Sequence, residues 1–336
     1  MVVPPKYFLT PKITQLLQSI EASKEVINSI EISKELETNI RRRSILKSSL
    51  FSARIEGNHL TLEVFNSAKQ NQGSQAKREV LNILKALNWV YERGSKDLTV
   101  KDILKLHQMV MEGLAQKQDM GKFRTEIGAI FNSGGIAIYL PPRPSQILPL
   151  IKKLIKFTNS EKEQFAPIKA SLAHYTFEKI HPFLDGNGRV GRLLLQEILQ
   201  KEGYGMKGVL PFEEYLDNHR SEYYRVLESS EKDVTDYVEF ILEAISETAK
   251  VVKEQFLKKE ELKVEDLLLP RRAEILNIIK DHRMADFDII RRRFLGVNER
   301  TLRYDLKKLV DTGLVKKRGT TKGVCYEAIS TPEVEL

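Results

Sequence analysis

The chain has 336 residues but only one cysteine, Cys325, and one tryptophan, Trp89. A single cysteine excludes a disulfide within the chain and cannot form a cysteine-rich metal cluster. No stretch approaches the roughly 18 apolar residues that a membrane span needs, and the first ten residues lack the apolar centre of a signal peptide. We therefore expect a cytoplasmic protein without membrane contact. We expect the single tryptophan, Trp89, to lie in the core.

Charge is abundant by contrast. Charged residues make up 30% of the chain and hydrophobic residues 41%, as is usual for a globular protein, and the net charge is +8. Residues 270–330 hold 15 Lys and Arg against 8 Asp and Glu, a net charge of +7. Nearly all of the positive excess therefore lies in this C-terminal segment.

The most informative stretch is residues 181–192, which read His-Pro-Phe-Leu-Asp-Gly-Asn-Gly-Arg-Val-Gly-Arg. His181 can accept a proton near neutral pH, as a general base must. Asp185 offers the hard oxygen ligand that Mg²⁺ prefers. The stretch therefore combines a base with a candidate metal ligand.

The same stretch also favours anion binding. Gly186, Asn187 and Gly188 can form a tight turn whose backbone N–H groups converge, and the apolar helix that follows puts this turn at a helix N-terminus. Arg189 and Arg192 are three residues apart and so share one helix face, which suits a polyphosphate. The alternative, a loop that caps a helix beside solvated arginines, does not explain the nearby base and acid.

This stretch resembles the signature of Fic proteins, His-Pro-Phe-x-Asp-Gly-Asn-Gly-Arg-x-x-Arg, at all nine fixed positions. The resemblance implies transfer of AMP from ATP to a Ser, Thr or Tyr hydroxyl of a target protein. It gives His181 the role of base and Asp185 that of Mg²⁺ ligand. The nucleotide contacts that it implies extend from the turn through Arg189, Val190, Gly191 and Arg192. The Doc branch, which moves a phosphoryl group, has lysine in place of the glycine at 188 and lacks the last arginine.

A second stretch, Ser52 to Asn58, reads Ser-Ala-Arg-Ile-Glu-Gly-Asn. Ser52 and Glu56 share a helix face, and Gly57 suits a helix C-terminus, so by itself the stretch is an ordinary helix end. Beside the Fic signature it resembles the inhibitory motif of Fic proteins. That resemblance implies that Glu56 pairs with Arg192, occupies the γ-phosphate site and blocks productive ATP binding.

A β-hairpin is expected inside this helical chain. Residues 123–131 and 136–140 are strand-like, and residues 132–135, Asn-Ser-Gly-Gly, form the turn. The hairpin could be purely structural. The resemblance implies a flap instead, whose edge at Ile136, Ala137, Ile138 and Tyr139 pairs with an extended target segment.

Other residues have two readings. Tyr223 and Tyr224 resemble the Fic segment that borders adenine, although such a pair on a helix usually packs in the core. Many relatives have an asparagine about seven residues later, where this chain has Ser230 and Glu231, which leaves that contact in doubt. His107 is expected to be a core histidine.

Residues 270–330 resemble a winged helix-turn-helix: helices at 271–280, 287–294 and 299–309 and then a hairpin. The helix at 299–309 resembles a recognition helix, so Arg300 and Arg303 would face DNA, with Lys316 and Lys317 on the wing. The alternative is a domain that contacts protein or packs in a homodimer.

The sequence thus predicts a mainly α protein: a Fic-type helical bundle with a β-hairpin flap and a C-terminal winged helix-turn-helix. We expect an N-terminal helical region at 1–95 with the inhibitory motif at 52–58, a catalytic core at 96–262 and the winged helix at 270–330. Within these regions residues 12–56 read as helical, a further helix begins at Thr61, and residues 213–230 form another. The expected activity is protein adenylyltransferase, with ATP and Mg²⁺. Alternatives are removal of AMP, with Glu56 orienting a water, and a DNA-binding regulator whose core only binds nucleotide.

Overall fold

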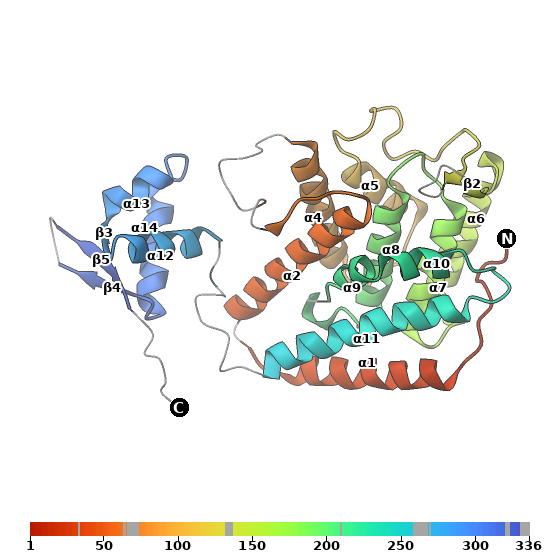
Figure 1. Cartoon of the computed structure of the whole chain (residues 1–336), viewed down its shortest axis with the longest axis horizontal. Helices are drawn as coiled ribbons and strands as arrows, with labels where there is room; N and C mark the ends of the chain where they lie inside the picture. Colours follow the sequence, from red (N-terminus) through yellow and green to blue (C-terminus); the bar gives the residue numbers. More distant parts are fainter. Residues whose placement is uncertain are drawn as a thin grey trace. The chain divides into compact units, whose positions relative to one another are not determined.

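The structure is a computed structural model that describes residues 1–32, 34–62, 65, 74–131, 137–208, 210–257, 268, 270–319 and 323–329. It is mainly α-helical, as predicted (Figure 1). The chain divides into two compact units, Met1–Ile32 with Arg41–Phe256 and Ser33–Ile40 with Leu257–Leu336. Among the described residues, no helix has the length and apolar character that crossing a membrane requires.

The helices and strands up to residue 257 run in this order: α1 (Pro11–Ser29), α2 (Lys34–Ile55), α4 (Gln75–Arg93), α5 (Val100–Val110), β1 (Ile130–Phe131), β2 (Ala137–Tyr139), α6 (Pro144–Thr158), α7 (Ala166–Ile180), α8 (Asn187–Lys201), the 3₁₀ helix η1 (Met206–Gly208), α9 (Glu213–Asn218), α10 (Arg220–Leu227) and α11 (Thr235–Leu257).

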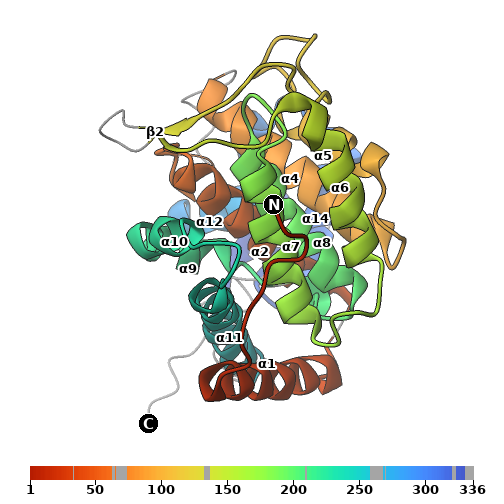
Figure 2. The ribbon, with the colours of Figure 1, turned by 90° about the vertical axis from the view of Figure 1, so that its right-hand side faces the viewer.

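Helices α7 and α8 form the centre of this unit and pack against each other, with α6 on α7 and with α4 and α5 on α8. Both helices are buried over most of their length. Helix α11 lies next to α1 in both views (Figure 1, Figure 2), and Ser246 Oγ donates to Ser19 Oγ at 2.8 Å. The loop between α7 and α8, which contains most of the signature, is therefore held at both ends by buried helices.

The N-terminal helical segment differs from the prediction. The sequence indicated helix over residues 12–56 with no proline to interrupt it, but the structure has α1 and α2 with a break after Ser29. Ile30 takes an extended backbone (ψ 119°), and its carbonyl accepts a hydrogen bond from Lys207 Nζ at 2.6 Å. A side chain from a distant segment thus satisfies the carbonyl that a continuing helix would have used.

The hairpin is shorter than predicted. Strands β1 and β2 pair antiparallel, but of the strand expected over residues 123–131 only the last two residues are in β1. The first part of the expected strand bonds the loop after α7 instead of β2: the Arg124 N–H donates to the Pro182 carbonyl at 2.9 Å. Residues 132–136, which include Ile136, lie outside the described part of the chain.

Two further helix boundaries differ. The single helix expected over residues 213–230 is split into α9 and α10 at His219, whose φ and ψ are −113° and 35°. Helix α8 begins at Asn187, so only Gly186 of the expected Gly-Asn-Gly turn is non-helical. The helix expected to begin at Thr61 falls largely outside the described residues.

In the C-terminal part of the second unit, the described residues form α12 (Pro270–Asp281), β3 (Met284–Asp286), α13 (Phe287–Arg293), α14 (Glu299–Asp311), β4 (Val315–Arg318) and β5 (Cys325–Ala328). The strands form an antiparallel sheet in the order β3-β5-β4. Its core is apolar and includes Ile275, Leu302 and Tyr326. Strand β3 was not predicted, because its three residues are too few to establish an alternating pattern in the sequence.

Candidate active site

Helix α7 ends at His181 in a strained backbone conformation. His181 has a φ of +47° and a ψ of 61°, in the left-handed region that residues other than glycine rarely adopt. The buried Arg124 braces this point: its guanidinium donates to the carbonyls of His181 at 2.8 Å, Glu126 at 2.8 Å and Pro142 at 2.6 Å. Arg124 therefore ties the candidate base to both flanks of the hairpin.

The imidazole of His181 is suited to accept a proton. Burial lowers the pKa of His181 below its usual value, so the ring is neutral at pH 7. The ring lies near the Glu178 backbone, which favours the protonated form, but its Nδ1 is buried and has no hydrogen bond of good geometry among the described residues. The ring is thus a neutral base that is not engaged by a protein acid.

His107 holds the loop that follows His181. Its Nδ1 accepts the Gly121 N–H at 2.9 Å, so Nε2 carries the proton and donates to the Asp185 carbonyl at 3.1 Å. The ring stacks on Phe183 at 3.8 Å, and burial lowers the pKa of His107 to about 4. His107 is buried, as expected, and it also positions the Asp185 backbone.

The first residues of α8 close the loop. The Asn187 side chain accepts the Phe183 N–H and donates to the Phe183 carbonyl, both at 2.9 Å, so it faces the loop. Gly186 has a φ of +79°, and a Cβ there would lie 2.7 Å from Met111 Sδ. Glycine is required here because a side chain would both strain the backbone and collide with Met111.

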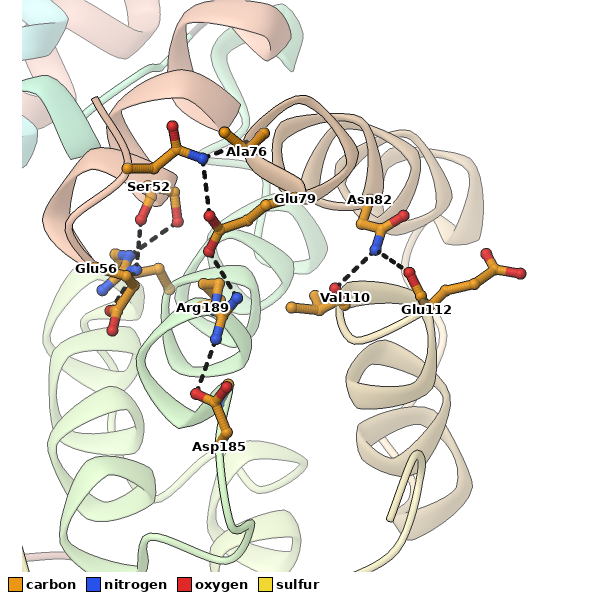
Figure 3. Close-up of polar contacts among 12 residues, drawn as sticks. Ser52, Glu56, Ala76, Glu79, Asn82, Val110, Glu112, Asp185 and Arg189 are labelled. Atoms are coloured by element: carbon orange, nitrogen blue, oxygen red, sulfur yellow. Dashed lines mark hydrogen bonds and ion pairs between the residues drawn. The ribbon is translucent and has the colours of Figure 1, made fainter. Parts of the chain in front are cut away.

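Arg192 is buried, and two of its three guanidinium nitrogens bond the α2 segment. It is 1% exposed. Its Nε donates to Ser52 Oγ at 3.0 Å, and its Nη2 donates to Ser52 O at 2.8 Å and to Glu56 Oε1 at 2.9 Å. Figure 3 shows the side chains of Ser52 and Glu56 next to each other. The structure thus brings together the three residues that the two motifs supplied.

Glu56 also lies over the first turn of α8. Its Oε1 is so close to Gly188 that a Cβ at that residue would overlap it. The N-terminal turn of a helix attracts anions, because its N–H groups lack partners within the helix. The Glu56 carboxylate therefore lies where an anionic ligand of α8 would be favoured.

Arg189 lies between two carboxylates. Its Nη1 donates to Glu79 Oε1 at 2.6 Å and its Nη2 to Asp185 Oδ1 at 2.9 Å (Figure 3). Sequence reasoning missed Glu79, which is on α4 and 110 residues from Arg189. No spacing in the sequence connects the two residues, so no signal there could have identified the pair.

Asp185 is suited to a Mg²⁺ ion that also binds substrate phosphates. Its side chain is 69% exposed, and its Oδ1 already accepts from Arg189 and from the Gly186 N–H at 2.5 Å. Among the described residues, no three His, Cys, Asp or Glu side chains form a metal cluster. Mg²⁺ is often held by one or two carboxylates plus phosphates and water, so a single exposed carboxylate fits.

Several predicted nucleotide contacts face the interior. Val190 is fully buried, and a Cβ at Gly191 would overlap the Glu178 carboxylate, so only the backbone of these two residues could meet a ligand. Tyr223 is 1% exposed and its hydroxyl faces His174 Nε2 at 3.4 Å. Of the tyrosine pair, Tyr224 alone presents surface, at 41% exposed.

An unexpected acid lies behind Arg192. Glu178 is on α7, and its Oε1 is buried without a hydrogen-bond partner in the described part of the chain. Burial raises the pKa of Glu178 to about 8, against the smaller opposing effect of Arg192. Glu178 is therefore mostly protonated at pH 7, which leaves Glu56 as the anionic partner of Arg192.

The hairpin lies next to α7. The Tyr139 hydroxyl donates to the Lys179 carbonyl at 3.1 Å, two residues before His181. Ala137 and Ile138 are in β2 with Tyr139. These contacts connect the end of β2 to the helix that carries the candidate base.

The basic residues predicted in the second unit are on its surface. Arg300 and Arg303 on α14 are exposed, as are Lys316 and Lys317 on β4. Arg303 lies over the Phe287 ring at 3.9 Å and approaches Glu299 at 3.7 Å. The four cations are therefore available to an anionic surface, although Arg303 has contacts within its own unit.

Known proteins resemble this chain over its central part. Residues 97–199 match the model of the Fic/DOC family. The chain is 29% identical over 243 residues to proteins named protein adenylyltransferase Fic from Drosophila sechellia and Drosophila melanogaster. That match covers 69% of this chain and 47% of each relative, so the chain spans about half the length of these relatives.

Solved structures show the same fold. A Fic family protein from Desulfovibrio desulfuricans has a TM-score of 0.65 and 24% identity, with 97% of this chain and 98% of that chain covered. Fic-1 from C. elegans has a TM-score of 0.56 and 22% identity, with 73% of this chain and 71% of that chain covered. The chain thus has the fold of these Fic proteins, its residues 97–199 match the Fic/DOC family model, and it is distantly homologous to proteins named protein adenylyltransferase Fic.

Proposed function

We propose that this protein is a protein adenylyltransferase, which transfers AMP from ATP to a hydroxyl side chain of a target protein. One observation carries the proposal: a neutral, half-buried His181 lies at the start of a loop that leads to a helix N-terminus with Arg189 and Arg192. A base beside a polyphosphate site is what nucleotidyl transfer requires. The distant homology to proteins of that name agrees with it.

In the proposed reaction, His181 takes the proton of the target hydroxyl, and the hydroxyl oxygen attacks the α-phosphorus. The bond from that phosphorus to the bridging oxygen breaks, and pyrophosphate leaves. General base catalysis of this kind contributes roughly 10²–10⁴ in rate. Arg189 and Arg192 bind the β- and γ-phosphates, while the backbone N–H groups of the first turn of α8 stabilise charge at the α-phosphate.

Mg²⁺ would be held by Asp185, and when bound it would neutralise phosphate charge. Arg189 Nη2 and the Gly186 N–H both donate to Asp185 Oδ1, so this carboxylate is fixed in place before any ligand arrives. Its second oxygen, on a 69% exposed side chain, is accessible to a cation from solvent. The residues of the chain thus orient the ligand in advance.

We further propose that Glu56 inhibits the enzyme. It neutralises Arg192, the arginine assigned to the γ-phosphate, and lies over the turn of α8 that a phosphate would occupy. Two anions cannot share this poorly solvated position without strong repulsion. ATP would therefore bind productively only after Glu56 moves away.

The target segment is proposed to add to the edge of β2 at Ala137, Ile138 and Tyr139, in an extended form. The bond from the Tyr139 hydroxyl to Lys179 O supports this placement, because it keeps β2 next to the helix that ends at His181. Backbone pairing along a strand edge tolerates many side chains, which suits recognition of an extended segment.

The second unit has a candidate function of its own. Three helices with a three-stranded sheet, and the exposed cations at Arg300, Arg303, Lys316 and Lys317, support a winged helix-turn-helix that binds DNA. Counterion release predicts that DNA affinity falls steeply with salt. Gel shifts of the full chain with genomic fragments at 50 and 200 mM salt test this: binding that does not change with salt, or no binding, contradicts it.

The transferase proposal is tested by incubating a protein lysate with ATP, Mg²⁺ and a Glu56→Gly variant, followed by mass spectrometry of peptides. Side chains that carry AMP, absent without the enzyme, are expected on Ser, Thr or Tyr. Added phosphate in place of AMP contradicts the proposal. Removal of AMP from pre-modified proteins, in a reaction that needs Glu56, identifies the reverse reaction as the activity.

A further inference from the structure

Glu79 lies behind the nucleotide-binding arginines that the signature supplies. It is on the second turn of α4, whose N-cap is Ser74, and its side chain is 15% exposed. One carboxylate oxygen accepts from Arg189 Nη1 at 2.6 Å and the other from Asn58 Nδ2 at 2.8 Å (Figure 3). Both oxygens of this carboxylate are therefore engaged, one by each motif.

Asn58 fixes the side of Glu79 that faces away from Arg189. Its Nδ2 also donates to the Ala76 carbonyl at 3.0 Å, and its Oδ1 accepts the Leu60 N–H at 3.0 Å. These bonds pin the end of the inhibitory motif to the start of α4. Asn58 is only 9% exposed, so water competes little for its amide.

Arg189 depends on these contacts for its orientation. It is 5% exposed, and its Nε is buried without a partner in the part of the chain that the structure describes. Its two terminal nitrogens bond Glu79 on one side and Asp185 on the other. A planar guanidinium that bonds a carboxylate through each terminal nitrogen has a fixed orientation. If one carboxylate were removed, the buried guanidinium would rotate or bind water.

We propose that Glu79 is a positioning residue for the nucleotide site: oriented by Asn58, it holds Arg189 in the direction that binds phosphate next to Asp185. The inference rests on the proposed function and deepens it. It gives the motif at 52–58 a second effect, because Glu56 opposes nucleotide binding while Asn58, two residues later, supports it. The two residues therefore have opposite effects on ATP affinity.

The test measures binding of α,β-methylene-ATP with Mg²⁺ by calorimetry, in the full chain with Glu56→Gly as parent. The analogue cannot be cleaved between its α- and β-phosphates, so activity does not enter the measurement. We expect Glu79→Gln to weaken binding by about tenfold or more, because the neutral Gln amide loses the charge that faces Arg189 and has only one oxygen to accept from Arg189 and Asn58. Glu112→Gln is the matched control: Glu112 pairs with Lys85 at 2.9 Å on an exposed surface, and its variant should bind as the parent does.

Two further variants separate positioning from general support of the fold. In an Arg189→Gln background, Glu79→Gln should have no further effect on affinity, because Glu79 affects nucleotide binding only through the Arg189 guanidinium. Asn58→Ala should weaken binding by about threefold in the parent. If Asn58 served only to hold the inhibitory segment, its loss would leave affinity unchanged in the parent and raise it in the wild type.

The outcomes distinguish this inference from the proposed function. Analogue binding that Glu79→Gln leaves unchanged contradicts the positioning role alone. Weakening that persists undiminished in the Arg189→Gln background also contradicts it, because the effect then does not pass through Arg189. A parent that does not bind the analogue at all contradicts the proposed function, and this inference with it.

Discussion

Glu56 and Arg192 are 136 residues apart in sequence, yet the carboxylate of the first lies 2.9 Å from the guanidinium of the second. Arg192 is 1% exposed and Glu56 about a third exposed, so the arginine is part of the core and the acid reaches it from the edge. Removing the acid leaves a buried cation beside a helix N-terminus, and this combination favours an incoming anion.

Glu56→Gly should therefore bind ATP about tenfold more tightly than the wild type, because the repulsion between two anions is removed. Calorimetry with α,β-methylene-ATP measures this. Glu56→Gln serves as the control, since it keeps the size of the side chain and removes its charge. Equal affinity in all three proteins, together with a lower melting temperature for the Gly variant, would mean that Glu56 supports only the fold.

The His181→Ala variant should lose AMP transfer by roughly 10²–10⁴-fold while it binds ATP almost as well as its parent. The reason is that His181 is assigned to the proton of the target hydroxyl and not to a phosphate. Transfer rates and ATP affinity are measured in the Glu56→Gly background. Full activity in the variant would remove His181 from the proposed mechanism.

The pH dependence of transfer follows from the same residue. Burial lowers the pKa of His181 below 6.5, and a base acts only when unprotonated, so activity is lost as the pH falls through that lowered value. The value of kcat/KM should rise with pH, with a midpoint below pH 6.5, and then level off. An acid limb whose midpoint lies above 6.5 would contradict the assignment of His181 as the base.

A surface contact should influence the inhibition. Arg54 pairs with Asp217 at 3.1 Å, and Tyr224 donates to the Ile55 carbonyl at 3.3 Å, so the last turn of α2 is held on α9 and α10 just before Glu56. Asp217→Asn should raise AMP transfer about two- to fivefold, because a partly exposed ion pair contributes up to about 1 kcal/mol.

Glu214→Gln is the control for this change. Glu214 pairs with Lys47 at 2.6 Å, and this ion pair lies further from the end of α2 than the pair of Arg54 and Asp217. The charge reversal Arg54→Asp with Asp217→Arg should restore the inhibition that either single change weakens. If Asp217→Asn is no more active than Glu214→Gln, the contact does not act on Glu56.

The sequence was informative where a function requires specific residues close together in the chain. His181, Asp185, Arg189 and Arg192 could be identified because they lie within one turn and one helix start. Helix ends with a local signal were also predictable, such as the Thr99 cap before α5 and Gly94 after α4.

Contacts that depend on packing between distant segments were not predictable. Glu79 on α4 accepts a hydrogen bond from Arg189, and Lys207 donates to the backbone at the break after Ser29. Neither contact leaves a pattern in the neighbouring sequence. The strand expected at residues 123–129 alternates well enough in sequence, but Arg124 pairs with Pro182 and braces His181 instead. Tertiary bonds override local propensity at these points.

The central claim is that AMP, with the α-phosphate of ATP, is transferred to protein with His181 as the general base, and paired labelling tests it most directly. The Glu56→Gly variant is incubated with Mg²⁺ and protein in the presence of ATP that carries ³²P either at the α- or at the γ-position. The account predicts that protein becomes labelled only by ATP that carries ³²P at the α-position. It predicts no protein-bound label from either form of ATP when the enzyme carries both Glu56→Gly and His181→Ala. Label from the γ-position, or α-label that survives His181→Ala, would contradict it.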